Sequence, residues 1–430
     1  SRKINVLYQN KPCYDICIED SFGALADALE PFALADRKVC IVTDSNVDPL
    51  YAAEVEDIVG AVSGECVRYV FPAGEESKTL DTVKEIYKFL IENHFNRKDL
   101  LIALGGGVVG DLTGFGAATY LRGIDFIQVP TTLLAQVDSS VGGKTGVDFQ
   151  QYKNMVGAFH QPRLVYMNLH TLRSLPAEQF ACGMGEILKT GLICDGDFFR
   201  YVCCEQKGIK KLDMEQIARM VRRCCEIKAG VVERDPKEQG ERALLNLGHT
   251  IGHAVEKLMD FKLLHGQCVA IGLIAAAKIS LNRGLLTEKE YQPYAISELI
   301  NYNQQKLGYT DEEVCEIAYD LFNKSNPKSD KVLTTETYRK IKQRNTQTSQ
   351  RGTNWLEYIA QALRFDSSDY KKYLTDAGMQ HAYSAVEKQS NEINSIDTLF
   401  DLLNFKEKSA LTQLTTGLLN LYMNAYNKIN

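Results

Sequence analysis

The chain has 430 residues, of which 45% are hydrophobic and 24% are charged. This composition excludes an intrinsically disordered chain, a collagen-like chain and a small disulfide-stapled domain, because it supplies enough apolar side chains for more than one packed core. The formal net charge of -6 is the opposite of the basic character of nucleic-acid-binding proteins, so no nucleic-acid partner is expected.

The sequence predicts a cytoplasmic protein with no membrane partner. No apolar run approaches the roughly 20 residues that cross a bilayer, and residues 1–10 lack the apolar core of a signal peptide. The 12 cysteines are scattered and form no CxxC pair. We therefore expect buried free thiols in a reducing compartment rather than a disulfide framework or a thiolate zinc site.

The first part of the chain alternates strand and helix patterns. Residues 38–42 and 67–71 are apolar runs typical of buried strands, and residues 79–93 carry apolar side chains at helical spacing. Residues 100–104 form a further strand-like run that ends in glycines. Strands that alternate with helices predict an α/β domain with a doubly wound, mainly parallel sheet, whose carboxyl edge opens onto a ligand crevice.

Beyond about residue 171 the pattern changes to long helices, such as 214–232 and 269–280. We predict the α/β domain over residues 1–174 and a mainly α-helical domain over 175–330. Residues 331–430 contain no proline or cysteine; they include a polar, linker-like stretch and then helical patterns to the end. They form a helical C-terminal extension of unassigned role.

A glycine-rich turn, GGGVVGD, occupies residues 105–111 directly after a strand-like run. Glycines let the backbone approach a pyrophosphate closely, and the helix expected next offers free N–H groups and the positive end of its dipole. An ordinary tight turn between strand and helix would look the same. Similar strand ends at Asp44 and at residues 75–78 favour a dinucleotide cofactor.

A second glycine-rich loop, VDSSVGGKTGVD, carries Lys144 between two aspartates. It is not a P-loop, because Asp138 occupies the position where a P-loop needs its first glycine. The lysine supplies a cation at a flexible backbone, as a substrate-binding loop requires.

Three of the seven histidines lie within seventeen positions. His249 and His253 are four residues apart, which places both on one face of a helix, and His265 follows about three helical turns later. The cluster favours a divalent metal such as zinc over hydrogen-bonded core histidines. The third ligand beside His249 and His265 is either His253 or a carboxylate such as Glu186, which stands in an apolar helix and needs a partner.

Basic side chains accompany these motifs. Lys189 lies one helical turn after Glu186, on the same face. Further basic residues stand in otherwise apolar stretches, namely Arg122, Lys228 and Arg242. Singly, each suits an ion pair or a solvated face. Together with Lys144 they can line a cationic pocket in an acidic protein, which suits a phosphorylated carboxylate.

In chain order, seven segments resemble the motifs of the 3-dehydroquinate synthase family: GEESKT, ALGGGVVGDLTGF, PTTLLAQVDSSVGGKTGV, YKNMVGAFHQP, LPAEQFACGMGEILKTG, LNLGHTIGHAVE and LHGQCVAIG. The resemblance covers residues 38–286. It implies a homodimeric carbon-oxygen lyase of the shikimate pathway, in aromatic amino acid and chorismate biosynthesis. Such an enzyme converts 3-deoxy-D-arabino-heptulosonate 7-phosphate, a sugar-phosphate acid, to 3-dehydroquinate and phosphate with bound NAD and Zn²⁺, or Co²⁺ in its place.

The resemblance also implies roles for individual residues. The metal ligands fall on Glu186, His249 and His265. The substrate-binding and catalytic positions are Asp138, Lys144, Asn154, Lys189, Lys228, Arg242, Asn246 and His253, with Arg122 lent across the dimer interface to the phosphate. The NAD contacts are Asp44, Glu75, Lys78, Gly106, Gly107, Asp111, Thr131, Thr132, Lys144, Lys153 and Thr171.

The implied chemistry is a hydride transfer from the C5 hydroxyl to NAD, β-elimination of phosphate, return of the hydride, ring opening and an aldol closure. Other sugar-phosphate cyclases share the fold and cofactors, but Lys228 and Arg242 favour a substrate with a carboxylate. Two alternatives are a metal- and NAD-dependent polyol dehydrogenase and an inactive scaffold whose tail binds a protein. After about residue 290 the family pattern ends, and only Lys328 or Lys331 can stand for the family's C-terminal lysine.

Overall fold

The structure is a computed structural model of the chain, and it describes residues 2–8, 11–150, 152–258, 263–285, 308–325, 332–344 and 355–363. The described residues fall into two compact units, one up to Ala275 and the other from Ala276 onward. All 12 cysteines are free, which confirms the expectation of thiols without disulfides.

The first unit is built on a seven-stranded sheet with the order β1-β2-β9-β6-β5-β3-β4. The strands are β1 (Arg2–Tyr8), β2 (Lys11–Glu19), β3 (Lys38–Asp44), β4 (Glu65–Phe71), β5 (Leu100–Gly105), β6 (Asp125–Pro130) and β9 (Leu164–Asn168). Only the pairing of β1 with β2 is antiparallel among the described strands of this sheet. The predicted doubly wound, mainly parallel sheet is confirmed.

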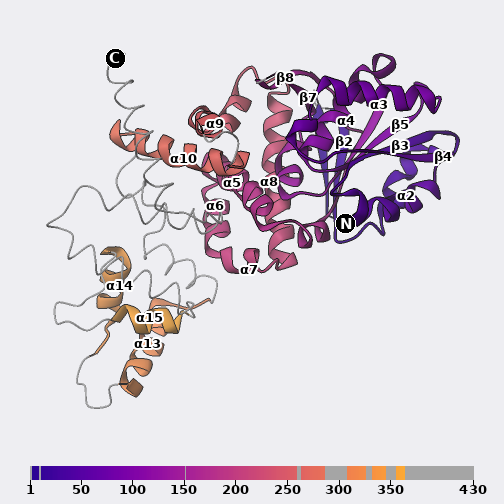
Figure 1. The fold of residues 1–430 in the computed structure, drawn as a ribbon. Coiled ribbons are helices and arrows are strands. Elements are labelled where there is room, and N and C mark those ends of the chain that lie inside the picture. The colour runs from indigo at the N-terminus through magenta and orange to yellow at the C-terminus, as the bar shows by residue number, and fades with distance from the viewer. Residues whose placement is uncertain are drawn as a thin grey trace. The chain divides into compact units, whose positions relative to one another are not determined.

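Helices cover both faces of the sheet. They are α1 (Leu25–Leu29), α2 (Ala53–Gly60), α3 (Leu80–Glu92) and α4 (Gly107–Thr119). Strand β5 shows why both faces are apolar: Leu100, Ile102 and Leu104 pack on the side of α1 and α2, whereas Leu101 and Ala103 pack on the side of α3 and α4. Figure 1 shows α2 on one side of the sheet and α3 and α4 on the other.

The second glycine-rich loop is shorter than expected, because a β-ribbon begins at Lys144. Strand β7 (Lys144–Phe149) pairs antiparallel with β8 (Tyr152–Phe159). Gly146 and Gly157 face each other in this ribbon, and an added Cβ on Gly157 would lie 2.3 Å from the Thr145 carbonyl oxygen. Two small residues therefore allow the strands to pair where the sequence suggests only a flexible loop.

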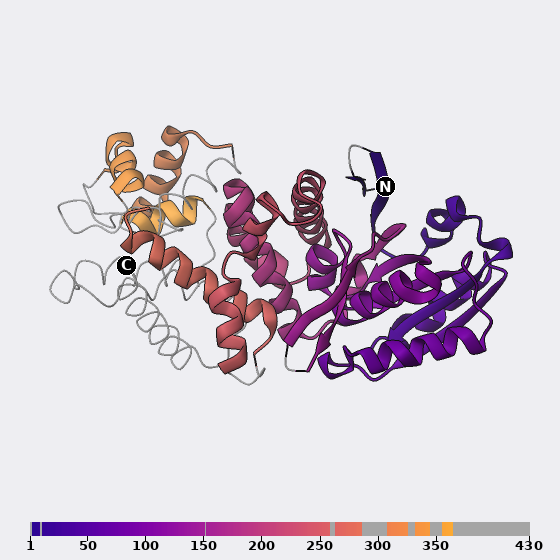
Figure 2. The same cartoon turned by 90° about the horizontal axis from the view of Figure 1, so that it is seen from above.

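Long helices follow residue 176, as predicted. They are α5 (Ala177–Cys194), α6 (Gly196–Cys204), α7 (Gln206–Lys210), α8 (Met214–Arg234), α9 (His249–Leu258) and α10 (His265–Asn282). Figures 1 and 2 show α5 to α8, in magenta and pink, grouped beside the sheet in both views. His249 and His253 share α9, but His265 begins a new helix, whose start is capped by the Gln267 Oε1 that accepts a hydrogen bond from the Leu264 N–H at 3.1 Å.

The second unit contains α13 (Asp311–Ser325), α14 (Thr335–Arg344) and α15 (Trp355–Ala362). Their core surrounds Trp355, whose ring lies 4.5 Å from that of Phe322. A reciprocal pair of hydrogen bonds between Thr310 and Glu313 caps α13. Lys328, Lys331 and the helical pattern predicted after residue 363 lie outside the described residues. Among the helices that the structure describes, none has the length and hydropathy of a membrane span.

Candidate active site

The carboxyl ends of the parallel strands meet at one edge of the sheet, where α4 begins directly after Gly106. Asp44 ends β3, and its carboxylate accepts hydrogen bonds from the N–H groups of Asn46 and Val47 at 2.9 and 3.0 Å. Thr131 follows β6 at the same edge and is buried. This edge therefore gathers the segments that the sequence predicts to contact NAD.

Lys78 connects the carboxyl edge of the sheet with the β-ribbon. Its ammonium lies 2.6 Å from an Asp111 oxygen in the first half of α4 and donates a hydrogen bond to Asn154 Oδ1 on β8 at 2.5 Å. Burial alone would lower the pKa of Lys78, but the charge of Asp111 raises it. Lys78 therefore stays charged although it is only 5% exposed.

A carboxylate and three imidazoles meet between α5, α9 and α10. Glu186 is 1% exposed, and its Oε2 pairs with the ammonium of Lys189. Its other oxygen, Oε1, has no hydrogen-bond partner among the described residues and lies 3.9 Å from His249 Nε2 and 3.7 Å from His265 Nε2. One ring nitrogen each from His249, His253 and His265 lies within 4.8 Å of the others.

This donor set fits a divalent metal such as zinc. An unpartnered buried carboxylate oxygen that faces two imidazole nitrogens is costly unless a cation joins them. Burial and the charge of Lys189 lower the pKa of His249 to about 4, and burial also lowers the pKa of His253. Both rings are therefore neutral at neutral pH, which is the form that binds a metal.

Glu256 is a site residue that the sequence analysis missed. It lies on α9, is 3% exposed, and places one oxygen 2.8 Å from Lys153 Nζ and the other 3.6 Å from His265 Nδ1. Burial would raise its pKa, but His265 and Lys153 lower it to about 2. Its position three residues after His253 puts it on the histidine face of the helix, which is a signal that the sequence contains.

Cationic side chains surround the histidine cluster. Lys228 pairs with the Asp138 carboxylate and also donates a hydrogen bond to the Asp138 carbonyl at 2.6 Å. Burial would raise the pKa of Asp138, but the charges of Lys228 and Lys189 hold it well below its usual range. Arg242 is 2% exposed and donates a hydrogen bond to the Gly142 carbonyl at 3.2 Å.

Gly142 is required by the position of Arg242. Its φ is +105°, and an added Cβ would lie 2.5 Å from Arg242 Nη2 and 2.9 Å from a methyl group of Val232. Both the left-handed backbone and the close approach exclude a side chain here. The backbone of the glycine-rich loop thus packs directly against the buried guanidinium of Arg242.

Glu238 is the second site residue that the sequence analysis missed. Its carboxylate pairs with Lys144 Nζ and accepts a hydrogen bond from Asn246 Nδ2 at 2.7 Å. It lies in the turn between α8 and Arg242 with a φ of +55°. No local sequence pattern identifies Glu238 as a site residue, because only the fold of the turn brings it to Lys144.

Arg122 is the predicted site residue that the chain does not bring to this edge. It lies near the amino end of β6, whereas Thr131 follows the carboxyl end, and a six-residue strand separates these ends by about 20 Å. Leu121, Arg122 and Gly123 all have positive φ values, between 49° and 117°.

Thr171, a predicted NAD contact, is 1% exposed, and its hydroxyl donates a hydrogen bond to the Asn168 carbonyl.

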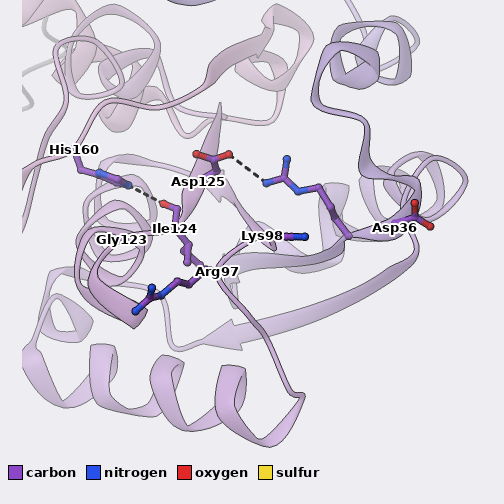
Figure 3. A pocket seen from close by; sticks show the side chains of 8 residues that line it. Asp36, Arg97, Lys98, Gly123, Ile124, Asp125 and His160 are labelled. Carbon is purple, nitrogen blue, oxygen red and sulfur yellow. Dashed lines mark hydrogen bonds and ion pairs between the residues drawn. The ribbon is translucent and has the colours of Figure 1, made fainter.

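A pocket lies near this opposite edge of the sheet, beside Asp125 (Figure 3). Arg37 lies 3.2 Å from the Asp125 carboxylate, and His160 Nε2 lies 2.8 Å from the Ile124 carbonyl oxygen. Figure 3 shows the side chains of Arg97 and Lys98 extending in different directions rather than toward one point. The pocket therefore lacks the converging groups of the histidine site.

Solved structures define the class of protein. The fold is similar to that of a 2-deoxy-scyllo-inosose synthase solved with carbaglucose-6-phosphate, NAD⁺ and Co²⁺, with a TM-score of 0.63 and 28% identity over 70% of this chain and 80% of that chain. It is also similar to a 2-epi-5-epi-valiolone synthase from Streptomyces hygroscopicus solved with NAD⁺ and Zn²⁺, with a TM-score of 0.61 and 27% identity over 69% and 82% of the two chains. The class is therefore that of the cyclase-like enzymes.

Sequence relatives narrow this class. The chain is 46% identical over 287 residues to the 3-dehydroquinate synthase of Acetivibrio thermocellus. This alignment covers 67% of this chain and 79% of the relative. It is 49% identical to that of Symbiobacterium thermophilum over 59% and 70% of the two chains. The family models for the N-terminal and C-terminal parts of 3-dehydroquinate synthase match residues 68–182 and 183–320. The chain belongs to the 3-dehydroquinate synthase family, as the resemblance implied, and the dehydrogenase alternative is not favoured.

Proposed function

We propose that the site between α5, α9 and α10 carries out the 3-dehydroquinate synthase reaction. The chain is a carbon-oxygen lyase that converts 3-deoxy-D-arabino-heptulosonate 7-phosphate to 3-dehydroquinate and phosphate. One observation supports this site above all: the unpartnered Glu186 Oε1 faces His249 and His265, while Lys189 pairs with the other oxygen of the same carboxylate.

In this proposal Glu186, His249 and His265 hold the metal, and the carboxyl edge of the sheet holds NAD. The solved cyclases that the chain resembles contain NAD⁺ with Zn²⁺ or Co²⁺, which supports the same cofactors here. When bound, the metal supplies Lewis acidity at the C5 oxygen of the substrate and NAD supplies a reversible hydride transfer. Residues 1–174 would form the NAD-binding domain and residues 175–330 the metal- and substrate-binding domain.

The charged side chains of the site position the substrate. Lys228 pairs with the Asp138 carboxylate and Lys189 with the Glu186 carboxylate, whereas Arg242 donates a hydrogen bond to the Gly142 carbonyl. Arg242 donates hydrogen bonds to backbone carbonyls through both terminal nitrogens, and it forms no ion pair with a carboxylate among the described residues. A substrate carboxylate or phosphate supplies the missing negative charge.

Lys144 and Asn246 both contact the Glu238 carboxylate in the structure. In this proposal an anionic group of the substrate replaces that carboxylate as their partner. In this proposal His253, the exposed member of the cluster, contacts the substrate. The two groups released by Glu238 can then orient the substrate over the histidine cluster.

Arg122 supports a homodimer in this proposal. Its own chain places it at the wrong edge of the sheet, about 20 Å from the carboxyl ends of the strands. The three consecutive positive φ values around Arg122 hold a fixed, unusual loop shape. Such a loop suits a residue that is presented to a neighbouring subunit.

The free thiols agree with a cytoplasmic location.

The test incubates the purified chain, loaded with NAD and Zn²⁺, with the heptulosonate phosphate while phosphate release and NADH absorbance are followed together. Phosphate release without accumulation of NADH is the expected result, because the hydride returns in every turnover. Net NADH formation without phosphate would instead identify a polyol dehydrogenase, and no reaction of either kind would overturn the proposal. Lys144→Ala serves as the inactive control.

A further inference from the structure

A chain of alternating charges runs from the NAD edge to the histidine cluster. Glu75, in the turn after β4, lies 3.6 Å from Lys153 Nζ on β8. Lys153 Nζ lies 2.8 Å from Glu256 Oε1 on α9, and Glu256 Oε2 lies 3.6 Å from His265 Nδ1 on α10. Four separate segments of the chain thus meet in one line of contacts.

Glu256 is the central member of this line. Its side chain is 4% exposed, and its two oxygens face different partners, so neither is free to turn away without leaving a buried charge unpaired. The helices that carry Glu256 and His265 are in close contact, because an added Cβ on Gly252 of α9 would lie 2.9 Å from the Cys268 carbonyl of α10. The position of Glu256 relative to His265 is therefore fixed by backbone packing.

The position of Glu256 decides which nitrogen of His265 is available. A carboxylate beside Nδ1 favours the tautomer with hydrogen on Nδ1, which leaves the lone pair on Nε2. That Nε2 is the nitrogen that lies 3.7 Å from the unpartnered Glu186 Oε1. The orientation of His265 thus agrees with a metal between these two atoms.

We propose that Glu256 is a positioning residue that orients His265 as a metal ligand and, through Lys153, couples metal binding to NAD binding. The inference rests on the proposed function, since it takes His265 as a ligand and Lys153 as an NAD contact. NAD that engages Lys153 changes the charge facing Glu256 and hence the hold of Glu256 on His265. Coupling of this kind is reciprocal, so the metal changes the affinity for NAD by the same factor.

The test measures Co²⁺ binding to the full chain after the resident metal is removed, by competition with a chromophoric chelator, with and without NAD. Glu256→Gln is expected to weaken Co²⁺ binding by about 10- to 100-fold and to change the visible absorption of the bound ion. It should also remove the effect of NAD on Co²⁺ affinity. Lys153→Gln should lose the response of Co²⁺ affinity to NAD, measured at NAD concentrations that a separate titration shows to saturate the variant.

Two further variants keep the test decisive. Lys257→Gln changes one charge on the adjacent, exposed residue of α9 and should behave as the wild type. Glu256→Asp keeps the charge on a shorter arm and should recover part of the Co²⁺ affinity, which also serves if Glu256→Gln does not fold. Wild-type Co²⁺ affinity and spectrum in both Glu256 variants would overturn this inference alone. Failure of the wild type to bind Co²⁺ would overturn the metal centre of the proposed function, and the inference with it.

Discussion

The contact between α10 and α5 offers a direct test of how tightly the proposed metal site is held. Gly266 follows His265 in the first turn of α10, and its N–H donates a hydrogen bond to the Cys182 sulfur at 3.1 Å. An added Cβ on Gly266 would lie 1.8 Å from the Cys182 carbonyl oxygen, far below the 3.0 Å at which real contacts begin. Gly266→Ala therefore requires α10 and α5 to separate by about 1.2 Å.

A displacement of this size is large for a catalytic site. Ligands and catalytic groups need to be held within about 0.5 Å of their working positions, and a misplacement of about 1 Å costs roughly 100-fold in rate. His265 is the residue next to Gly266, so it moves with the helix start. Gly266→Ala should lower turnover by about 100-fold, weaken Co²⁺ binding, and destabilise the protein by about 1–3 kcal/mol through overpacking.

The assay compares phosphate release, Co²⁺ affinity and thermal unfolding with those of Gly196→Ala. An added Cβ on Gly196, in the first turn of α6, meets nothing within 4 Å. This control should retain turnover and gain up to about 1 kcal/mol of stability, because alanine favours a helix over glycine. Wild-type turnover and Co²⁺ affinity in Gly266→Ala would refute the reasoning, since the helices would then have tolerated the shift without moving His265.

Three further predictions concern other parts of the first unit. Gly142→Ala should raise the KM for the heptulosonate phosphate more than it weakens NAD binding, measured by steady-state kinetics and NAD titration, because its Cβ would displace the Arg242 guanidinium. Asp195→Asn should cost about 0.5–1 kcal/mol in urea unfolding at pH 7. The backbone N–H of Phe198 and the charge of Arg223 lower the pKa of Asp195 despite the opposing effect of burial. Its stabilisation is therefore complete above the ordinary value of 3.8 and is lost as the pH falls below it, so an equal cost at pH 2 would contradict this. Arg122→Ala and Lys144→Ala should each be inactive alone, but a 1:1 mixture allowed to exchange subunits should regain about a quarter of wild-type activity if Arg122 serves the partner's site, because about half of the dimers are then mixed and each has one intact site; no recovery would contradict that arrangement.

Local patterns predicted the parts of the fold that local physics decides. The alternation of β5 and the apolar spacing of α8 depend on burial of neighbouring residues, so residues 100–104 and 214–232 could be read from the sequence. The ribbon of β7 and β8 was missed because Gly146 and Gly157, which let its two strands approach closely, are loop signals in the sequence.

The candidate site likewise contains residues that local spacing predicts and residues that only the tertiary fold brings together. His249 and His253 were placed correctly on one helix face, since their spacing is local. His265 was predicted only to follow about three helical turns later; in the structure it begins α10, where Gly266 packs against α5. Glu238 reaches Lys144 only through the turn that follows α8, so nothing in its neighbours identified it. The metal ligands and NAD contacts remain predictions from the family resemblance, to which the geometry adds support.

The chain contains a single tryptophan, whose fluorescence can serve as an intrinsic donor for energy transfer. Trp355 is buried in the core of the second unit, whereas the proposed NAD edge belongs to the first unit. Indole emission overlaps the absorption band of reduced nicotinamide, so energy transfer from Trp355 to bound NADH depends on the distance between the two units. Time-resolved fluorescence of the unlabelled chain can therefore follow, during turnover, how far the helical unit lies from the cofactor.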